Sequence, residues 1–107
     1  MPGREDFERD EDILVEDENE ADLEEPPRYR VILHNDDYTT MEFVIEVLLT
    51  VFHRSAQDAH RLMLQVHTLG MAVGGIYPYE IAEAKVDRVT QLARAREFPF
   101  QLTKFGG

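Results

Sequence analysis

The sequence contains no cysteine and no long apolar run. Because cysteine is absent, the chain can form neither a disulfide framework nor a thiolate zinc site, and this composition fits a reducing compartment. No apolar stretch reaches the roughly 18 residues of a membrane-spanning helix, and the N-terminus lacks the apolar core of a secretory signal. We therefore expect a soluble, cytoplasmic protein with no membrane partner.

Basic residues are not in excess either, since the formal net charge is −11. Residues 1–25 hold 13 acidic residues against Arg4 and Arg9, which leaves residues 26–107 with nine acidic and nine basic residues. A protein whose main partner is nucleic acid needs a basic surface to neutralise phosphates. The composition therefore predicts no nucleic-acid partner.

The charge imbalance lies wholly in residues 1–25, which contain few apolar side chains. Like charges at this density repel one another, and so little apolar surface cannot offset the entropy of ordering. We expect a disordered acidic extension, whose simplest role is to keep the chain in solution. Pro26 and Pro27 mark the boundary with one small folded domain over residues 26–107, which we expect to be monomeric.

The first half of this domain predicts a strand, a loop and a helix. Residues 29–33 are short, rich in β-branched side chains and flanked by turn residues, as strands are. Residues 35–39 form a loop, and Thr40 or Thr39 is suited to be the N-cap of the helix that follows. Apolar residues then recur at the three-to-four spacing of an amphipathic helix: Met41, Val44, Ile45, Leu48, Leu49 and Phe52.

The second half predicts two more helices and two more strands. Ser55 caps a helix that ends near Gly70, and residues 71–77 form a strand in which Gly74 and Gly75 indicate a bulge or a close approach of the backbone to a neighbour. Pro78 opens the last helix. Residues 98–103 form an edge strand, because Pro99 cannot donate a ladder hydrogen bond. The order β-α-α-β-α-β predicts an α+β domain with three helices on a three-stranded, mainly antiparallel sheet.

A candidate site lies where the first strand meets the first helix. Asn35, Asp36 and Asp37 offer hydrogen-bond acceptors just before an apolar helical face, which suits a ligand that is cationic at one end and apolar at the other. On the first helix Met41 and Val44 share a face, and on the second helix so do Met63, Val66 and His67. If the two faces meet, they line a pocket. Equally, the loop residues have ordinary turn and cap chemistry, and the apolar stripes are ordinary core.

The histidines suggest two other kinds of chemistry. His67 with Asp36 or Asp37 could serve as a general acid–base pair, but the sequence has no nucleophile elbow or phosphate loop around which to build a reaction. His53, His60 and His67 recur every seven residues, but a helix break separates the first two, and no metal-binding motif is present. We therefore expect no enzyme activity, no catalytic residue, no metal and no cofactor.

Three separated segments closely resemble the ClpS family, namely residues 31–44, 62–67 and 79–86. The resemblance spans residues 26 to about 103. ClpS proteins are adaptors that deliver N-degron substrates to the ClpA unfoldase of the ClpAP protease. The resemblance implies the same small α+β fold, and binding of proteins whose first residue is Phe, Leu, Tyr or Trp. It also places residues 1–25 where the family has a flexible extension that engages the unfoldase.

The resemblance assigns roles to individual residues. The positions that hold the substrate α-amino group and first backbone groups match Asn35, Asp36, Asp37, Thr39 and His67. Those that line the side-chain pocket match Leu33, Met41, Val44, Met63, Val66 and Phe100. Positions that contact the ClpA N-terminal domain match Glu80 and Lys85.

Within this set, Met41 resembles the family gatekeeper against β-branched first residues. The chain also departs from the family pattern, since Thr40 stands where many members have proline and Phe100 stands where leucine is common. A larger ring at position 100 would shrink the pocket and disfavour Trp. The alternative hypothesis is a protein–protein docking domain like the C-terminal domain of the bacterial ribosomal stalk protein, which has a similar element order but no such pocket.

Overall fold

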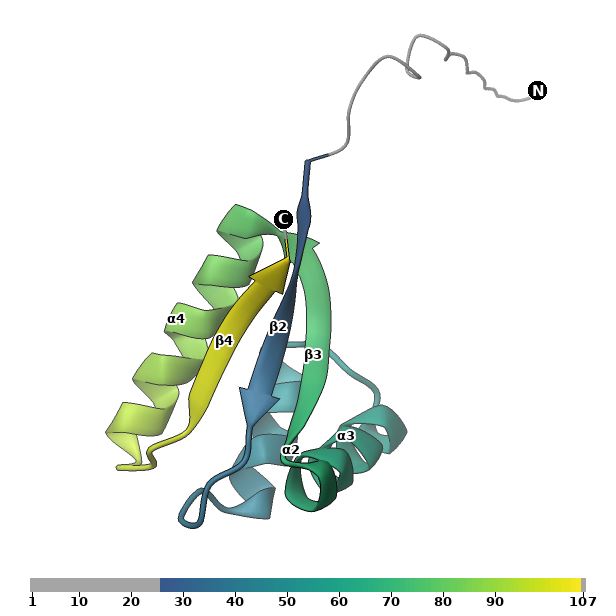
Figure 1. The fold of residues 1–107 in the computed structure, drawn as a ribbon. Coiled ribbons are helices and arrows are strands. Elements are labelled where there is room, and N and C mark those ends of the chain that lie inside the picture. Colours follow the sequence, from purple (N-terminus) through teal and green to yellow (C-terminus); the bar gives the residue numbers. More distant parts are fainter. Residues whose placement is uncertain (1–25, 107) are drawn as a thin grey trace, which may run out of the picture.

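A three-stranded antiparallel sheet forms one layer of the molecule in the computed structural model, which describes residues 26–106 (Figure 1). The central strand is β2 (Arg28–His34), and it pairs on one side with β3 (Met71–Pro78) and on the other with β4 (Gln101–Gly106). The predicted acidic extension, residues 1–25, lies outside the described residues and stays a prediction.

Three helices complete the predicted order β-α-α-β-α-β, which is confirmed together with the α+β class. They are α2 (Met41–Thr50), α3 (Ala56–Leu69) and α4 (Tyr79–Ala95). In Figure 1, α4 lies along the sheet, whereas α2 and α3 gather at the end where β2 finishes. Among residues 26–106, no helix is both long and apolar enough to cross a membrane.

The helix ends follow the local signals in the sequence. The Thr40 hydroxyl accepts a hydrogen bond from the backbone N–H of Phe43 at 3.2 Å, so Thr40 rather than Thr39 is the N-cap of α2. Ser55 accepts from the N–H of Asp58 at 3.1 Å and caps α3. Gly70 ends α3 with φ at 92°, a left-handed conformation that glycine adopts without steric cost.

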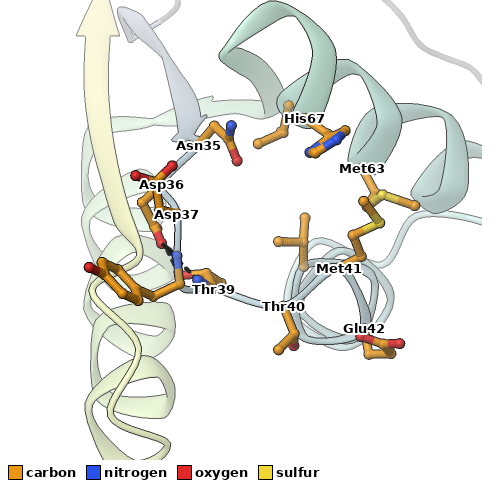
Figure 2. Close-up of a pocket in the computed structure, with 12 residues that line it drawn as sticks. Asn35, Asp36, Asp37, Thr39, Thr40, Met41, Glu42, Met63 and His67 are labelled. Atoms are coloured by element: carbon orange, nitrogen blue, oxygen red, sulfur yellow. Dashed lines mark hydrogen bonds between the residues drawn. The ribbon is translucent and has the colours of Figure 1, made fainter.

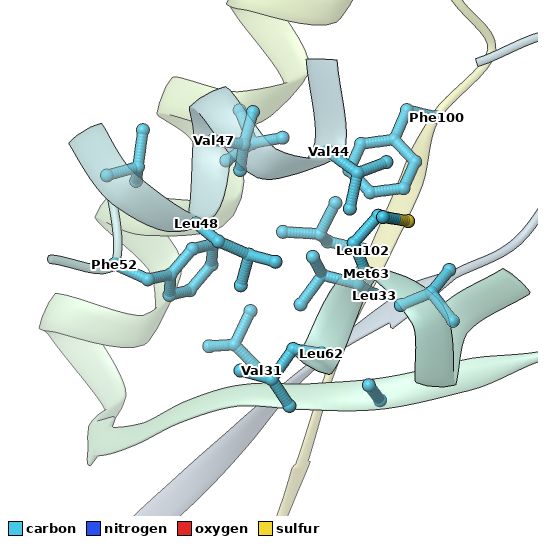
Figure 3. Close-up of a cluster of buried hydrophobic side chains, with 14 of the residues drawn as sticks. Val31, Leu33, Val44, Val47, Leu48, Phe52, Leu62, Met63, Phe100 and Leu102 are labelled. Atoms are coloured by element: carbon cyan, nitrogen blue, oxygen red, sulfur yellow. The ribbon is translucent and has the colours of Figure 1, made fainter. Parts of the chain in front are cut away.

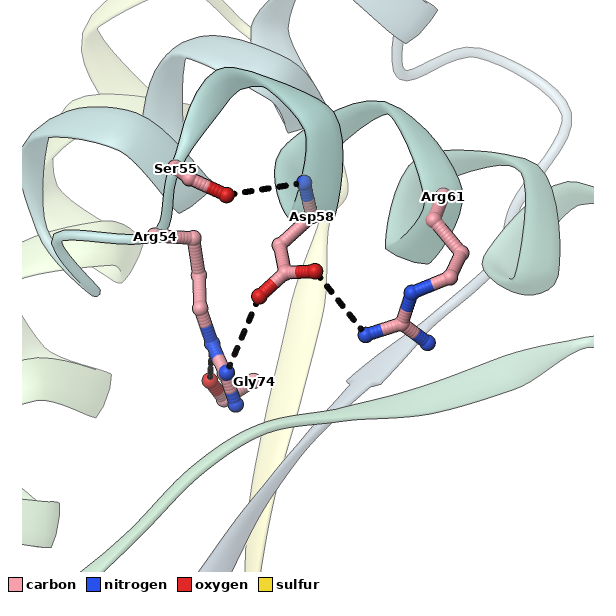
Figure 4. Close-up of polar contacts among 5 residues, drawn as sticks. All are labelled: Arg54, Ser55, Asp58, Arg61 and Gly74. Carbon is pink, nitrogen blue, oxygen red and sulfur yellow. Dashed lines mark hydrogen bonds and ion pairs between the residues drawn. The ribbon is translucent and has the colours of Figure 1, made fainter.

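The predicted bulge in the second strand is present at Gly74. Val31 of β2 is opposite Gly75, whereas Ile32 is opposite Val73, so Gly74 is the extra residue. Its carbonyl accepts a hydrogen bond from the Arg54 guanidinium at 2.9 Å (Figure 4). The bulge is thereby tied to the turn that precedes α3.

The last strand differs from the prediction. It begins at Gln101 and runs to Gly106, rather than covering residues 98–103. Phe98 and Phe100 instead pack on Phe43 of α2, with ring centroids 5.1 and 6.1 Å apart. These tertiary contacts hold the segment around Pro99 against the helix, so ladder pairing starts only after it. The strand does lie at an edge of the sheet, as predicted.

The core lies between the sheet and the helices (Figure 3). Val31 and Leu33 of β2 and Val47 and Leu48 of α2 are fully buried in it. Burial of both elements anchors the two ends of the loop that joins them. That loop, residues 35–40, therefore joins two elements that are both anchored in the core.

Close packing at the bulge gives a test of the fold. A Cβ atom added at Gly74 would lie 2.7 Å from Leu33 Cδ1 and 3.1 Å from Phe52 Cε1, both of which belong to buried side chains. We expect Gly74→Ala to lower the free energy of unfolding by about 1–3 kcal/mol, measured by urea denaturation.

The neighbouring Gly75→Ala is the matched control. Its added methyl would meet the hydroxyl end of Tyr77, which is only half-buried, rather than the buried side chains of Leu33 and Phe52. We expect a smaller loss of stability in this variant. If Gly74→Ala is as stable as the unaltered protein, the side chains of Leu33 and Phe52 can shift to accommodate the added methyl group.

Candidate functional site

A pocket of about 460 Å³ opens between the β2–α2 loop, the first turns of α2 and the second half of α3 (Figure 2). The structure brings together there nine of the residues that the sequence suggested: Asn35, Asp36, Asp37, Thr39, Met41, Val44, Met63, Val66 and His67. Three further lining residues, Tyr38, Thr40 and Glu42, were not assigned to the site from the sequence. All three lie within residues 35–44, the run that contains the other site residues of the loop and of α2, and this position in the sequence could have identified them.

The carboxylate of Asp36 organises the loop. Its Oδ1 accepts hydrogen bonds from the backbone N–H groups of Tyr38 at 2.8 Å and Thr39 at 2.7 Å, and its Oδ2 accepts from the Thr39 hydroxyl at 2.7 Å. This is the turn chemistry typical of an aspartate before a helix. The same contacts also fix the loop that forms one side of the pocket.

These hydrogen bonds decide the charge of Asp36. Burial alone would raise the pKa of its carboxyl, but the hydrogen bonds from the Thr39 hydroxyl and the two backbone N–H groups outweigh that effect and lower the pKa below its ordinary value. Asp36 is therefore a carboxylate at neutral pH. The rim of the pocket carries a fixed negative charge close to the loop backbone.

Asn35 and His67 occupy the other part of the polar rim. The backbone N–H of Asn35 donates to the carbonyl of Gly70 at 2.9 Å, which fastens the start of the loop to the end of α3. Figure 2 shows the Asn35 and His67 side chains on the same side of the opening. A carboxamide and an imidazole can both accept a hydrogen bond from a cationic N–H group.

The opposite wall is apolar. Met41 and Met63 lie side by side there, one from each helix (Figure 2). Val44, Met63 and Val66 are buried and belong to the main core, whereas Met41 is 43% exposed. The wall is therefore a face of the core, and Met41 forms its accessible edge.

Leu33 and Phe100 are not among the residues that line this pocket. Leu33 is fully buried in β2, and Phe100 packs edge-on against Phe43. Both belong to the same core cluster as Val44 and Met63, so they lie behind the wall rather than on its surface (Figure 3). A direct contact of either residue with a ligand stays a prediction.

Glu80 and Lys85 line a separate hollow of about 380 Å³ between the end of α2 and the start of α4. Lys85 is half-buried, its Nζ donates to the carbonyl of Val51 at 2.7 Å, and it lies 5.2 Å from the centre of the Tyr77 ring. Glu80 is exposed in the first turn of α4. Lys85 therefore holds α4 against α2 as well as facing this hollow.

The polar groups of the pocket suit binding more directly than catalysis. Both oxygens of Asp36 accept hydrogen bonds from Tyr38 and Thr39, so this carboxylate serves to hold the loop in place. Among residues 26–106, no three side chains of His, Asp or Glu gather closely enough to hold a metal ion.

Three comparisons with known proteins bear on this site. A family model described as "ATP-dependent Clp protease adaptor protein ClpS" matches residues 24–103. The ClpS adapter of Acetivibrio thermocellus is 52% identical over 89 residues, which are 83% of this chain and 90% of that protein. The ClpS adapter of Myxococcus xanthus is 44% identical over 96 residues, or 90% of each chain.

A solved structure is similar as well. It is Agrobacterium tumefaciens ClpS2 bound to L-phenylalaninamide, which has a TM-score of 0.74 and 38% sequence identity. The match covers 78% of this chain and all of that one. With three-quarters of its length matched by the family model and most of it by close relatives, the chain belongs to the ClpS family of Clp protease adaptors.

Proposed function

We propose that this chain binds proteins through a free, bulky hydrophobic N-terminal residue, namely Phe, Leu, Tyr or Trp, and delivers them to a ClpA-type unfoldase. One observation carries the proposal: a single pocket has a rim of acceptors beside an apolar wall. The similar ClpS2 was solved with L-phenylalaninamide, a molecule that carries both a free α-amino group and a Phe side chain.

The rim accounts for recognition of the amino terminus. An ammonium group has three N–H donors and favours acceptors of negative or partial negative charge. A carboxylate offers about four acceptor positions, and three of those of Asp36 are taken by the loop. Asp36 therefore acts mainly through its charge and by shaping the loop, while Asn35 and the imidazole of His67 supply further acceptors.

The wall accounts for selection of the first side chain. Burial of a Leu or Phe side chain against Met41, Val44 and Met63 contributes roughly 1.5–3 kcal/mol. That free energy is too small by itself for tight binding. The free energy of an ammonium contact close to solvent is also too small by itself. Because both are needed, hydrophobic residues inside a chain, which lack the ammonium group, do not bind.

Delivery rests on the second hollow. Glu80 and Lys85 match family positions that contact the N-terminal domain of ClpA, and here they line one surface together. The proposal places the unfoldase on this surface and the acidic residues 1–25 in the family role of engaging it during transfer. We also propose that the protein is monomeric, cytoplasmic and not an enzyme.

Fluorescence anisotropy with labelled peptides tests the binding step. We expect a peptide that starts with Phe or Leu to bind with a dissociation constant of about 1 μM or below. The same peptide starting with Ala, or acetylated at its N-terminus, should bind much more weakly, because it lacks the side chain or the charge. Equal binding of all the peptides would contradict the proposal and favour the docking-domain alternative.

Removal of the Asp36 side chain tests the rim. We expect Asp36→Ala to weaken binding of the Phe peptide by at least about tenfold, because it removes a charge and releases the Thr39 contacts. Asp87→Ala is the control, since Asp87 is exposed on α4 and does not line the pocket. Unchanged affinity in a folded Asp36→Ala protein would remove Asp36 from the site.

Shortening Met41 tests the gatekeeper role. We expect Met41→Ala to admit peptides that start with Ile or Val, because it clears the accessible edge of the wall where a β-branched side chain would clash. Leu64→Ala is matched to it, since Leu64 is similarly exposed on α3 but does not line the pocket. If Ile and Val peptides still fail to bind Met41→Ala, another residue excludes them.

A further inference from the structure

The chain has four methionines, of which Met41, Met63 and Met71 lie in the described part. Met41 is 43% exposed, Met63 is 4% exposed and Met71 is 49% exposed. Met71 begins β3 and does not line the pocket. Among these three residues, Met41 alone combines access from solvent with a place in the ligand-binding wall.

Access matters because thioethers react directly with hydroperoxides. The sulfur lone pair attacks one peroxide oxygen, the O–O bond breaks, and a sulfur–oxygen bond forms while the other oxygen leaves with a proton as water or an alcohol. Sulfur loses two electrons and the peroxide gains them. No ionisation of the side chain is needed, so exposure of the sulfur governs which methionine reacts first.

Oxidation would change the wall in two ways. A sulfoxide is polar and accepts hydrogen bonds, so an apolar side chain entering the pocket would have to strip water from it. The added oxygen would also stand at the edge where Met41 meets Met63 (Figure 2). Core packing would be less affected, because Met41 lies outside the buried cluster to which Val44, Met63 and Val66 belong.

We propose that Met41 is a modification site at which hydroperoxides switch off recognition of the N-terminal residue by forming the sulfoxide. This inference rests on the proposed function of the pocket. Methionine sulfoxide is reduced enzymatically, so the switch is reversible by a sulfoxide reductase.

The test uses the full chain treated with hydrogen peroxide under conditions that leave it folded. Mass spectrometry locates the oxidised residues, and anisotropy measures the affinity for a Phe-starting peptide without Met or Cys. The same treatment is applied to Met41→Leu and to Met71→Leu, and each protein is compared with its own untreated sample. Leucine keeps the wall apolar and cannot be oxidised by peroxide.

We expect oxidation to weaken binding by at least about tenfold in the unaltered protein and in Met71→Leu. In Met41→Leu the affinity should change by less than about twofold. Treatment with methionine sulfoxide reductases should restore binding in the first two proteins. Failure of the unaltered, untreated protein to bind the peptide would refute the proposed function itself.

Three outcomes would overturn the inference while leaving the proposed function intact. In the first, Met41 sulfoxide forms fully and the affinity does not change. In the second, Met71 is oxidised and Met41 is not, which would mean that the pocket shields its sulfur. In the third, Met41→Leu loses affinity as much as the unaltered protein, so that the effect arises elsewhere.

Discussion

The pocket depends on one carboxylate that is satisfied within its own loop. Asp36 accepts three hydrogen bonds from Tyr38 and Thr39, at 2.7 to 2.8 Å, and this fixes the path of the chain between β2 and α2. Because the loop is already ordered, a ligand need not meet the conformational entropy cost of ordering it. The same contacts keep Asp36 ionised, so the geometry and the negative charge of the rim have a common origin.

The apolar wall is a part of the core rather than an addition to it. Val44, Met63 and Val66 are buried with the residues that hold α2 and α3 together, and they also line the pocket. A change at these positions would alter stability and binding at once. Met41 differs because it is substantially exposed, so it is the position of the wall where chemistry or mutation can act with least effect on the fold.

Features with a local cause could be predicted from the sequence. The caps at Thr40, Ser55 and Gly70 and the bulge at Gly74 each depend on a few neighbouring residues, and the structure has all four. The spacing put Met41 and Val44 on one helical face and Met63, Val66 and His67 on another, but that these two faces meet at a pocket was only one of two alternatives until the structure placed all five residues there. Features that depend on tertiary packing could not be predicted: the late start of β4 follows from the contacts of Phe98 and Phe100 with Phe43.

Helix α2 links the two surfaces of the proposed function. Its first residues, with the Thr40 cap, line the binding pocket, and its last residue, Thr50, lines the hollow that holds Glu80 and Lys85. A helix of ten residues is about 15 Å long. The two surfaces therefore lie at opposite ends of one short helix, so under the proposed function the substrate and the unfoldase would occupy separate parts of the adaptor. Lys85 also donates a hydrogen bond to the carbonyl of Val51, the C-cap of α2, so the second surface is joined directly to the helix whose first turns line the pocket.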